Sequence, residues 1–159
     1  MQAVLFTGIQ GSGKSTFYKR FLFRTHVRIS LDLLRTRHRE ARFLDLCLDT
    51  RSRFTVDNTN PTAGDRRRYI VPASRLGYEL ICCYFTSDID SALARNSSRQ
   101  RREVVAERGI WATFRKLQPP TFEEGFSRIY TIGIEQNGDY LIESAGENSV
   151  VPFPLFRMG

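Results

Sequence analysis

Short apolar runs alternate with longer amphipathic stretches along most of this chain. Each run is β-branched or aromatic and is bounded by turn residues, which is typical of buried strands. Such runs occupy residues 4–6, 27–30, 54–56, 80–85 and 129–134. Between them, helical spacing of apolar residues covers 14–24, 33–48, 62–76 and 88 to about 101. Strands alternating with helices predict an α/β fold with a central parallel sheet flanked by helices.

The carboxyl-terminal part is read from its turn signals. Asn137, Gly138 and Asp139 predict a turn that joins the strand at 129–134 to a further strand at 140–143. The final VVPFPLFRMG fits either packing over the sheet or contact with a partner. Repeats and linkers are absent from the sequence, so we expect one domain over residues 1–159 with a carboxyl-terminal extension at about 137–159.

The composition is that of a globular protein, with 41% hydrophobic and 26% charged residues. The three cysteines, Cys47, Cys82 and Cys83, lie in apolar surroundings, and neither histidine stands at a metal-ligand spacing from them. We therefore expect reduced thiols in the core. With no signal-peptide pattern and no apolar run of membrane-spanning length, we also expect a cytoplasmic protein without membrane contact.

The charge balance indicates an anionic partner. The chain has 24 basic and 17 acidic residues, a net charge of +7, and three of the basic residues are lysines. Arginine favours bidentate contact with phosphate oxygens, so polyanions fit as partners. A solvated basic surface without a partner is the competing interpretation.

Residues 8–16, GIQGSGKST, match the phosphate-binding pattern GxxxxGK[ST] between a predicted strand and a predicted helix. Backbone N–H groups of such a loop surround nucleotide phosphates at a helix N-terminus. Lys14 would contact the β- and γ-phosphates of a nucleoside triphosphate such as ATP, and the Ser15 hydroxyl would ligate Mg²⁺. The candidate nucleotide-binding residues of the loop are Gly8, Gly11, Ser12, Gly13, Lys14, Ser15 and Thr16. The expected fold is thus a P-loop NTPase of the adenylate-kinase-like type.

Two further acids follow predicted strands. Asp32 comes directly after the second strand, with Arg35 one helical turn later, so a base would lie beside an anion clamp. A helix N-cap for Asp32 and a solvated Arg35 are the alternative. Asp57 ends the third strand, where an acid is expected near the magnesium, and Asn58, Thr59 and Asn60 are candidate caps of the next helix.

Arg95 and Arg99 are spaced four apart in a predicted helix and would share one face. Two such arginines can close over a triphosphate and stabilise charge in the transition state, which predicts a helical lid over about 88–108. Solvated helix residues are the alternative.

These residues together resemble the 5′-hydroxyl polynucleotide kinase family, the kinase module of polynucleotide kinase/phosphatase enzymes. The resemblance spans most of the chain and rests on segments in the same order: the loop GIQGSGKST, Asp32 with Arg35, VDNTNP at 56–61, ARNSSR at 94–99 and PTFEEGF at 120–126. It implies that Asp32 is the general base, that Arg35 binds the acceptor-strand phosphate, and that Arg95 and Arg99 bind the donor phosphates. Asp57 matches the third-strand acid of the family, at the metal or substrate.

The resemblance implies transfer of the γ-phosphate to a 5′-OH end of DNA or RNA, in nucleic-acid repair. No DxDGT-type phosphatase motif occurs in the sequence, so we expect any 3′-end chemistry to come from a separate phosphatase or ligase partner. Small-molecule P-loop kinases of the zeta-toxin-like or chloramphenicol-phosphotransferase-like type share the same scaffold. A nucleic-acid-binding ATPase without an acceptor is a third interpretation.

Aromatic and basic residues add candidates for contact with a nucleic acid. Tyr69, Phe43 and Trp111 are conceivable stacking platforms, but helical spacing favours a place in the core for each of them. The run Arg66, Arg67 and Arg68 faces either nucleic-acid phosphates or water.

Overall fold

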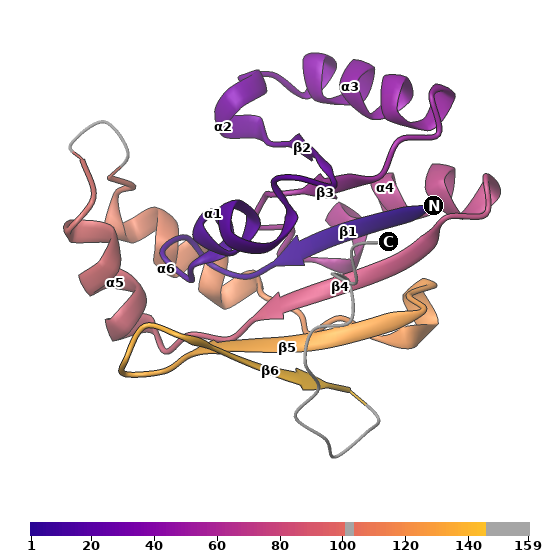
Figure 1. The fold of residues 1–159 in the computed structure, drawn as a ribbon. Helices are drawn as coiled ribbons and strands as arrows, with labels where there is room; N and C mark the ends of the chain where they lie inside the picture. The colour runs from indigo at the N-terminus through magenta and orange to yellow at the C-terminus, as the bar shows by residue number, and fades with distance from the viewer. Residues whose placement is uncertain (101–103, 146–159) are drawn as a thin grey trace.

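The computed structural model describes residues 1–100 and 104–145 and contains a six-stranded sheet in the order β2-β3-β1-β4-β5-β6 (Figure 1). The strands are β1 (Gln2–Thr7), β2 (Val27–Ile29), β3 (Phe54–Val56), β4 (Glu79–Phe85), β5 (Arg128–Ile134) and β6 (Tyr140–Ser144). Neighbouring strands from β2 to β5 pair in parallel, and β6 pairs with β5 in antiparallel orientation. The predicted strands and the hairpin at 137–139 are thereby confirmed.

Helices connect the strands and cover both faces of the sheet. They are α1 (Lys14–Phe17), continued by a π-helical turn η1 (Tyr18–Leu22), then α2 (Leu31–Leu34), α3 (Arg37–Asp49), α4 (Ala63–Arg75), α5 (Ile89–Ser97), α6 (Glu107–Lys116) and the 3₁₀ turn η2 (Phe122–Glu124). No helix in the described part of the chain is long and apolar enough to cross a membrane.

Alternation along the strands divides the core between the two faces. In β1, Ala3 and Leu5 pack with residues of α3 and α4, whereas Val4 and Phe6 pack with α1 and η1. The adjacent Cys82 and Cys83 of β4 likewise belong to opposite clusters. Both thiols and that of Cys47 are free and buried, as the sequence predicts.

The single helix predicted over 33–48 is wrong, because the chain breaks it at Arg35. Arg35 has a positive φ of 71° and ends α2, and Thr36 is extended, with φ −134° and ψ 148°. The Thr36 side chain accepts a hydrogen bond from Arg39 N and thus caps α3 as a separate helix. The capping interaction requires extended backbone at Thr36, which a continuous helix would not allow.

A buried ion pair joins α4 to the turn before β5. Arg66 is fully buried and donates from Nε and Nη2 to the two carboxylate oxygens of Glu124, at 2.7 and 2.6 Å. Its Nη1 donates to the carbonyl oxygens of Asn60 and Gln118. Contact of Arg66 with nucleic-acid phosphates is therefore excluded, whereas its neighbour Arg67 is exposed. The pair fixes the PTFEEGF segment, as expected of a structural turn.

The hairpin of β5 and β6 packs against the phosphate-binding loop at Gly13. Gly13 has a φ of 91°, and a Cβ there would lie 2.7 Å from Ile134 Cδ1. Tyr140 of β6 donates its hydroxyl hydrogen to Gly13 O at 2.9 Å and packs edge-on against Phe17. The loop therefore requires glycine at this position, both for its backbone conformation and for close approach of the hairpin.

Candidate functional site

The phosphate-binding loop lies between the carboxyl end of β1 and the first residue of α1. Lys14 is buried, and its Nζ donates to Gly8 O at 3.0 Å, Ile9 O at 2.5 Å and Ser12 Oγ at 3.2 Å. The ammonium group therefore sits inside the loop that its own backbone forms, at the place where nucleotide phosphates bind in such loops.

The pKa of Lys14 is lowered from its usual 10.5 to about 8, chiefly because burial disfavours the charged amine. The negative charges of Asp57 and Asp32 act against this, and the positive charge of Arg99 adds to it. The charges of Asp57 just after β3, Asp32 in α2 and Arg99 just after α5 thus all act on Lys14, although these residues are distant in sequence.

Ser15 and Asp57 meet beside Lys14. Ser15 Oγ donates to Asp57 Oδ2 at 2.9 Å, and the Asp57 carboxylate is almost completely buried. A hydroxyl and a carboxylate are the hard oxygen donors that Mg²⁺ prefers, so this pair fits the ion. Among residues 1–100 and 104–145, no group of three or more His, Cys, Asp or Glu side chains could hold a metal. A site with two protein oxygens matches Mg²⁺ that keeps waters and nucleotide phosphates as its other ligands.

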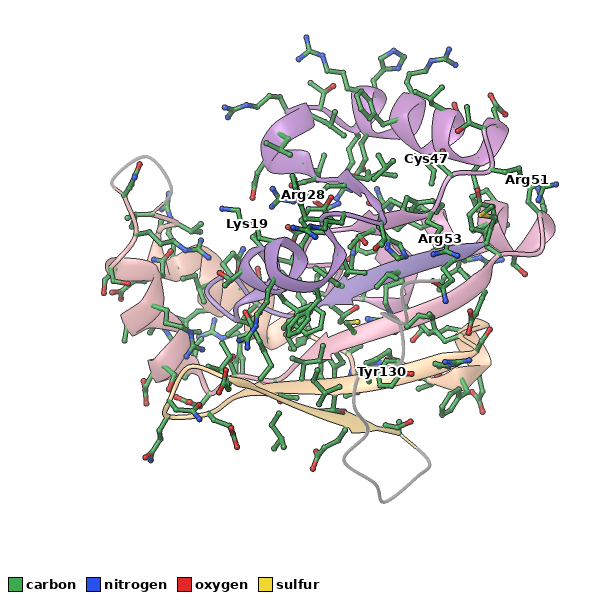
Figure 2. All side chains as sticks on the ribbon, in the orientation of Figure 1. Lys19, Arg28, Cys47, Arg51, Arg53 and Tyr130 are labelled. Carbon is green, nitrogen blue, oxygen red and sulfur yellow. The ribbon has the colours of Figure 1, made fainter. Side chains whose placement is uncertain are left out.

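Arg28 completes this cluster, and sequence reasoning missed it. Its Nε donates to Asp57 Oδ2 at 2.8 Å, and its Nη2 donates to Ser15 Oγ at 3.0 Å. Figure 2 shows the Arg28 side chain between β2 and α1. Strand register explains the contact. Arg28 pairs with Thr55 of β3, and Asp57 comes two residues after Thr55, so the side chains of Arg28 and Asp57 face the same side of the sheet.

Asp32 lies in the first turn of α2, directly beyond the carboxyl end of β2, and is exposed. The N-cap of α2 is Ser30, so the interpretation of Asp32 as the cap is wrong. Arg35 is also exposed but lies just past the end of α2 rather than one turn along a helix. Asp32 is therefore within electrostatic reach of Lys14, and Arg35 is exposed at the end of the same short helix.

Asn58 positions the start of α2. Its Oδ1 accepts from Leu31 N at 2.9 Å, and its Nδ2 donates to Glu40 Oε1 and to Tyr69 OH. The predicted role of residues 58–60 as helix caps is wrong, because Thr62 caps α4 in a capping box with Asp65. Asn58 of the VDNTNP segment instead ties the start of α2 to Glu40 of α3 and Tyr69 of α4.

The lid residue Arg95 reaches the phosphate-binding loop. Its Nε donates to Gly11 O at 2.6 Å, and its Nη2 donates to Ser87 Oγ at 3.0 Å. Arg99 lies beyond α5, which ends at Ser97, so the two arginines do not share a helical face as predicted. Both nevertheless approach the loop, because the charge of Arg99 acts on Lys14.

Helices α5 and α6 form a unit that packs on the loop. Ile9 of the loop contacts Ala92 and Ile110 in one buried cluster. The Asn96 side chain donates to Val105 O and accepts from Val105 N, and thereby holds the segment before α6 against α5. The predicted helical lid is therefore present, with residues 101–103 outside the described part.

The three aromatic residues considered as stacking platforms differ in their burial. Tyr69 is buried in the core, as expected, and its hydroxyl donates to Glu40. Phe43 and Trp111 are 42% and 36% exposed, so the expectation that they pack inward is wrong for both. The segment VVPFPLFRMG lies outside the described residues.

Comparison with known proteins gives a consistent picture. No family model matches the chain. The chain is 25% identical over 143 residues to the bifunctional polynucleotide phosphatase/kinase of Schizosaccharomyces pombe, covering 87% of this chain and 35% of that protein. It thus spans about a third of the length of this curated relative.

Two solved structures share the fold. A gluconokinase from Sinorhizobium meliloti 1021 is 15% identical with a TM-score of 0.60, covering 85% of this chain and 83% of the other. Kti12 of Chaetomium thermophilum, in complex with ADP-AlF3, is 14% identical with a TM-score of 0.64, covering 86% and 92%. Loop motif, sheet order and these similarities show that the chain has the α/β fold of P-loop NTPases, the fold that these two structures also have.

Proposed function

We propose that the protein transfers the γ-phosphate of ATP or another nucleoside triphosphate to the 5′-hydroxyl end of a DNA or RNA strand. The observation that carries the proposal is the position of Asp32, an exposed carboxylate at the end of β2 whose charge reaches the buried Lys14. A carboxylate within electrostatic reach of the phosphate-binding loop suits a hydroxyl acceptor, which needs a base to accept its proton. The name of the S. pombe relative, a polynucleotide phosphatase/kinase, supports the same acceptor class.

The donor nucleotide would bind at the P-loop. Lys14, the loop N–H groups and the start of α1 would hold its β- and γ-phosphates, with Arg95 and Arg99 approaching from the lid. Ser15 and Asp57 would hold Mg²⁺, which when bound would neutralise charge on the β- and γ-phosphates. Most of the catalysis would then come from positioning and electrostatic stabilisation.

The acceptor hydroxyl would be oriented by Asp32, which would also accept its proton. Arg35 lies three residues later on the exposed surface and would bind a phosphate of the acceptor strand. The exposed residues His38, Arg39 and Arg42 continue this basic surface along α3. A strand whose 5′ end lies at Asp32 would meet positive charge there, as a polyanionic acceptor requires.

The test measures transfer of label from γ-labelled ATP, with Mg²⁺, to 5′-OH oligonucleotides of DNA and of RNA. A 5′-phosphorylated oligonucleotide serves as the blocked acceptor. The proposal expects label on 5′-OH ends alone, and at least about 100-fold less of it for Asp32→Asn, the usual size of a general-base effect. Asp49→Asn, an exposed acid at the end of α3, is the matched control and should label as the unsubstituted protein does.

Binding of ADP to Asp32→Asn at pH 7 should change little, because Lys14 is charged there and Asp32 acts mainly on the acceptor. Full label transfer by Asp32→Asn would contradict its role as the base. ATP consumption without label on either oligonucleotide would favour a small-molecule acceptor or an acceptor-free ATPase.

A further inference from the structure

The contacts of Arg28 place a positive charge on the same two oxygen atoms that fit Mg²⁺. Asp57 Oδ2 accepts from Nε and Nη2 of Arg28 and from the hydroxyl of Ser15. Nη2 donates to Ser15 Oγ as well. The guanidinium group thus bridges the hydroxyl and the carboxylate, as a bound cation would.

The surroundings of Arg28 hold it in this position. Its guanidinium carbon lies 5.4 Å from the centre of the ring of Tyr18, the first residue of η1, which is a cation–π contact. The Arg28 side chain is 19% exposed, and that of Asp57 is 2% exposed. A carboxylate buried to this degree needs a compensating positive charge, which Arg28 supplies.

The same contacts oppose binding of a divalent ion. A Mg²⁺ ligand must offer a lone pair, and one of the two lone pairs on Ser15 Oγ already accepts from Arg28 Nη2. A divalent cation bound to Ser15 would also lie close to the guanidinium charge, and like charges at such short range repel strongly inside a protein. Arg28 and the metal therefore compete for Ser15 and Asp57.

We propose that Arg28 is a tethered counter-ion of the divalent-metal site. It holds Ser15 and Asp57 together through its hydrogen bonds, and its positive charge opposes binding of a divalent ion at the same two oxygens. Arg28 thereby sets the Mg²⁺ concentration at which the site fills. This role concerns the metal and the nucleotide alone, so it does not depend on the identity of the acceptor.

The first measurement is a Mg²⁺ titration of nucleotide binding, followed by the fluorescence of a labelled ADP at a fixed, subsaturating concentration. Arg28→Met keeps much of the side-chain volume and removes the charge. We expect its Mg²⁺ midpoint to fall about three- to tenfold, because the competing charge is gone. The matched control is Arg128→Met, which removes another strand arginine paired with a carboxylate, Glu79, at the opposite end of the strands. Its midpoint should not move.

The second measurement is thermal unfolding with EDTA and with Mg²⁺ plus ADP. Arg28→Met leaves Asp57 buried without its partner, so its melting temperature in EDTA should fall, and Mg²⁺ with ADP should raise it more than in the unsubstituted protein. If Arg28→Met does not fold, Arg28→Lys carries the test. Lysine keeps one charge but lacks the fork that reaches both oxygens, so its midpoint should also fall, by a smaller factor.

An unchanged or higher Mg²⁺ midpoint in Arg28→Met, or in Arg28→Lys where only that variant folds, would overturn the proposal. Such a result would make Arg28 a structural partner of Asp57 that stays in place when the metal binds. Because both readouts are binding and stability, a failure of oligonucleotide labelling leaves their interpretation intact.

Discussion

Lys14 must carry a charge although it is buried. Its ammonium group must be charged to attract phosphates, yet the loop buries it, and burial brings its pKa down to about 8. In the free protein the charged form is therefore costly below pH 8, and this cost is relieved as the pH rises from about 8 towards 10.5. Nucleotide phosphates reverse the preference, because they favour the charged amine.

We expect ADP binding to take up a proton above pH 8. Affinity for ADP should be roughly tenfold lower at pH 9 than at pH 7, since most of the free protein then carries a neutral Lys14. Isothermal titration calorimetry in two buffers of different ionisation enthalpy measures both the affinity and the proton uptake. Lys14→Arg, which stays charged throughout, should lose the pH dependence. Equal affinity and no proton uptake at pH 9 would contradict the lowered pKa.

Single residues were predictable from sequence where a local motif identifies them. Lys14 and Ser15 follow from loop spacing, and Asp32 and Asp57 follow from their places after strands. Arg28 was not predictable in this way, because its contacts with Ser15 and Asp57 span 13 and 29 positions and depend on strand register. The fully buried Arg66 was equally hidden, since its partner Glu124 lies 58 positions away.

At the scale of elements, the closest contact of the site is between the P-loop and α5. Gly11 has a φ of 77°, and a Cβ added to it would lie 2.4 Å from Ala92 O. The helix therefore approaches the loop as closely as the absence of a side chain permits. The sequence predicted a helix here, but its docking on the loop required the tertiary contact of Ile9 with Ala92.

Gly11→Ala should push α5 away from the loop and strain the backbone, with a stability loss of about 1–3 kcal/mol. Affinity for ADP should fall as well, because Arg95 would lose its place at Gly11 O. Urea unfolding and ADP titration measure the two effects. Gly64→Ala, where the nearest atom lies 3.7 Å from the added Cβ, is the control and should gain about 0.5–1 kcal/mol as a helix residue. Equal behaviour of the two variants would show that α5 does not depend on the contact.

For elements, the sequence predicted strands more accurately than helix ends. Apolar runs mark buried strands directly, so the bounds of β3 and β5 match closely. The break between α2 and α3 depends on the Thr36 cap, and the early end of α5 depends on Ser98, neither of which interrupts the apolar pattern. Local hydrogen bonds that compete with the helix explain both differences.

At the scale of the whole molecule, the arginines divide into a buried group and an exposed group. Some arginines are structural, such as the buried Arg66, whereas Arg39 and Arg42 are exposed on α3, on the surface proposed to bind an acceptor strand. Net charge was predictable from composition, but the separation into buried and exposed arginines was not. Only the exposed group contributes to a field that attracts a polyanion.

Replacing both Arg39 and Arg42 by glutamine should raise the KM for a 5′-OH oligonucleotide several-fold and leave the KM for ATP unchanged. The slope of log KM for the oligonucleotide against the logarithm of salt concentration should decrease by about 1, as expected for the loss of two phosphate contacts on a single strand. Arg75→Gln with Arg128→Gln is the control, because it removes the same charge at the other end of the strands. Matching effects of the two double variants would argue against a binding surface on α3.

The burial of every cysteine in the chain has a practical consequence. Cys47, Cys82 and Cys83 are free, and burial raises the pKa of each thiol, that of Cys82 to about 12. Thiolates react with maleimides and thiols do not, so the folded chain offers almost no labelling background at neutral pH. A cysteine introduced at the exposed Ser97 of α5 would then accept a fluorophore selectively, and the position of the lid could be followed in solution during nucleotide binding.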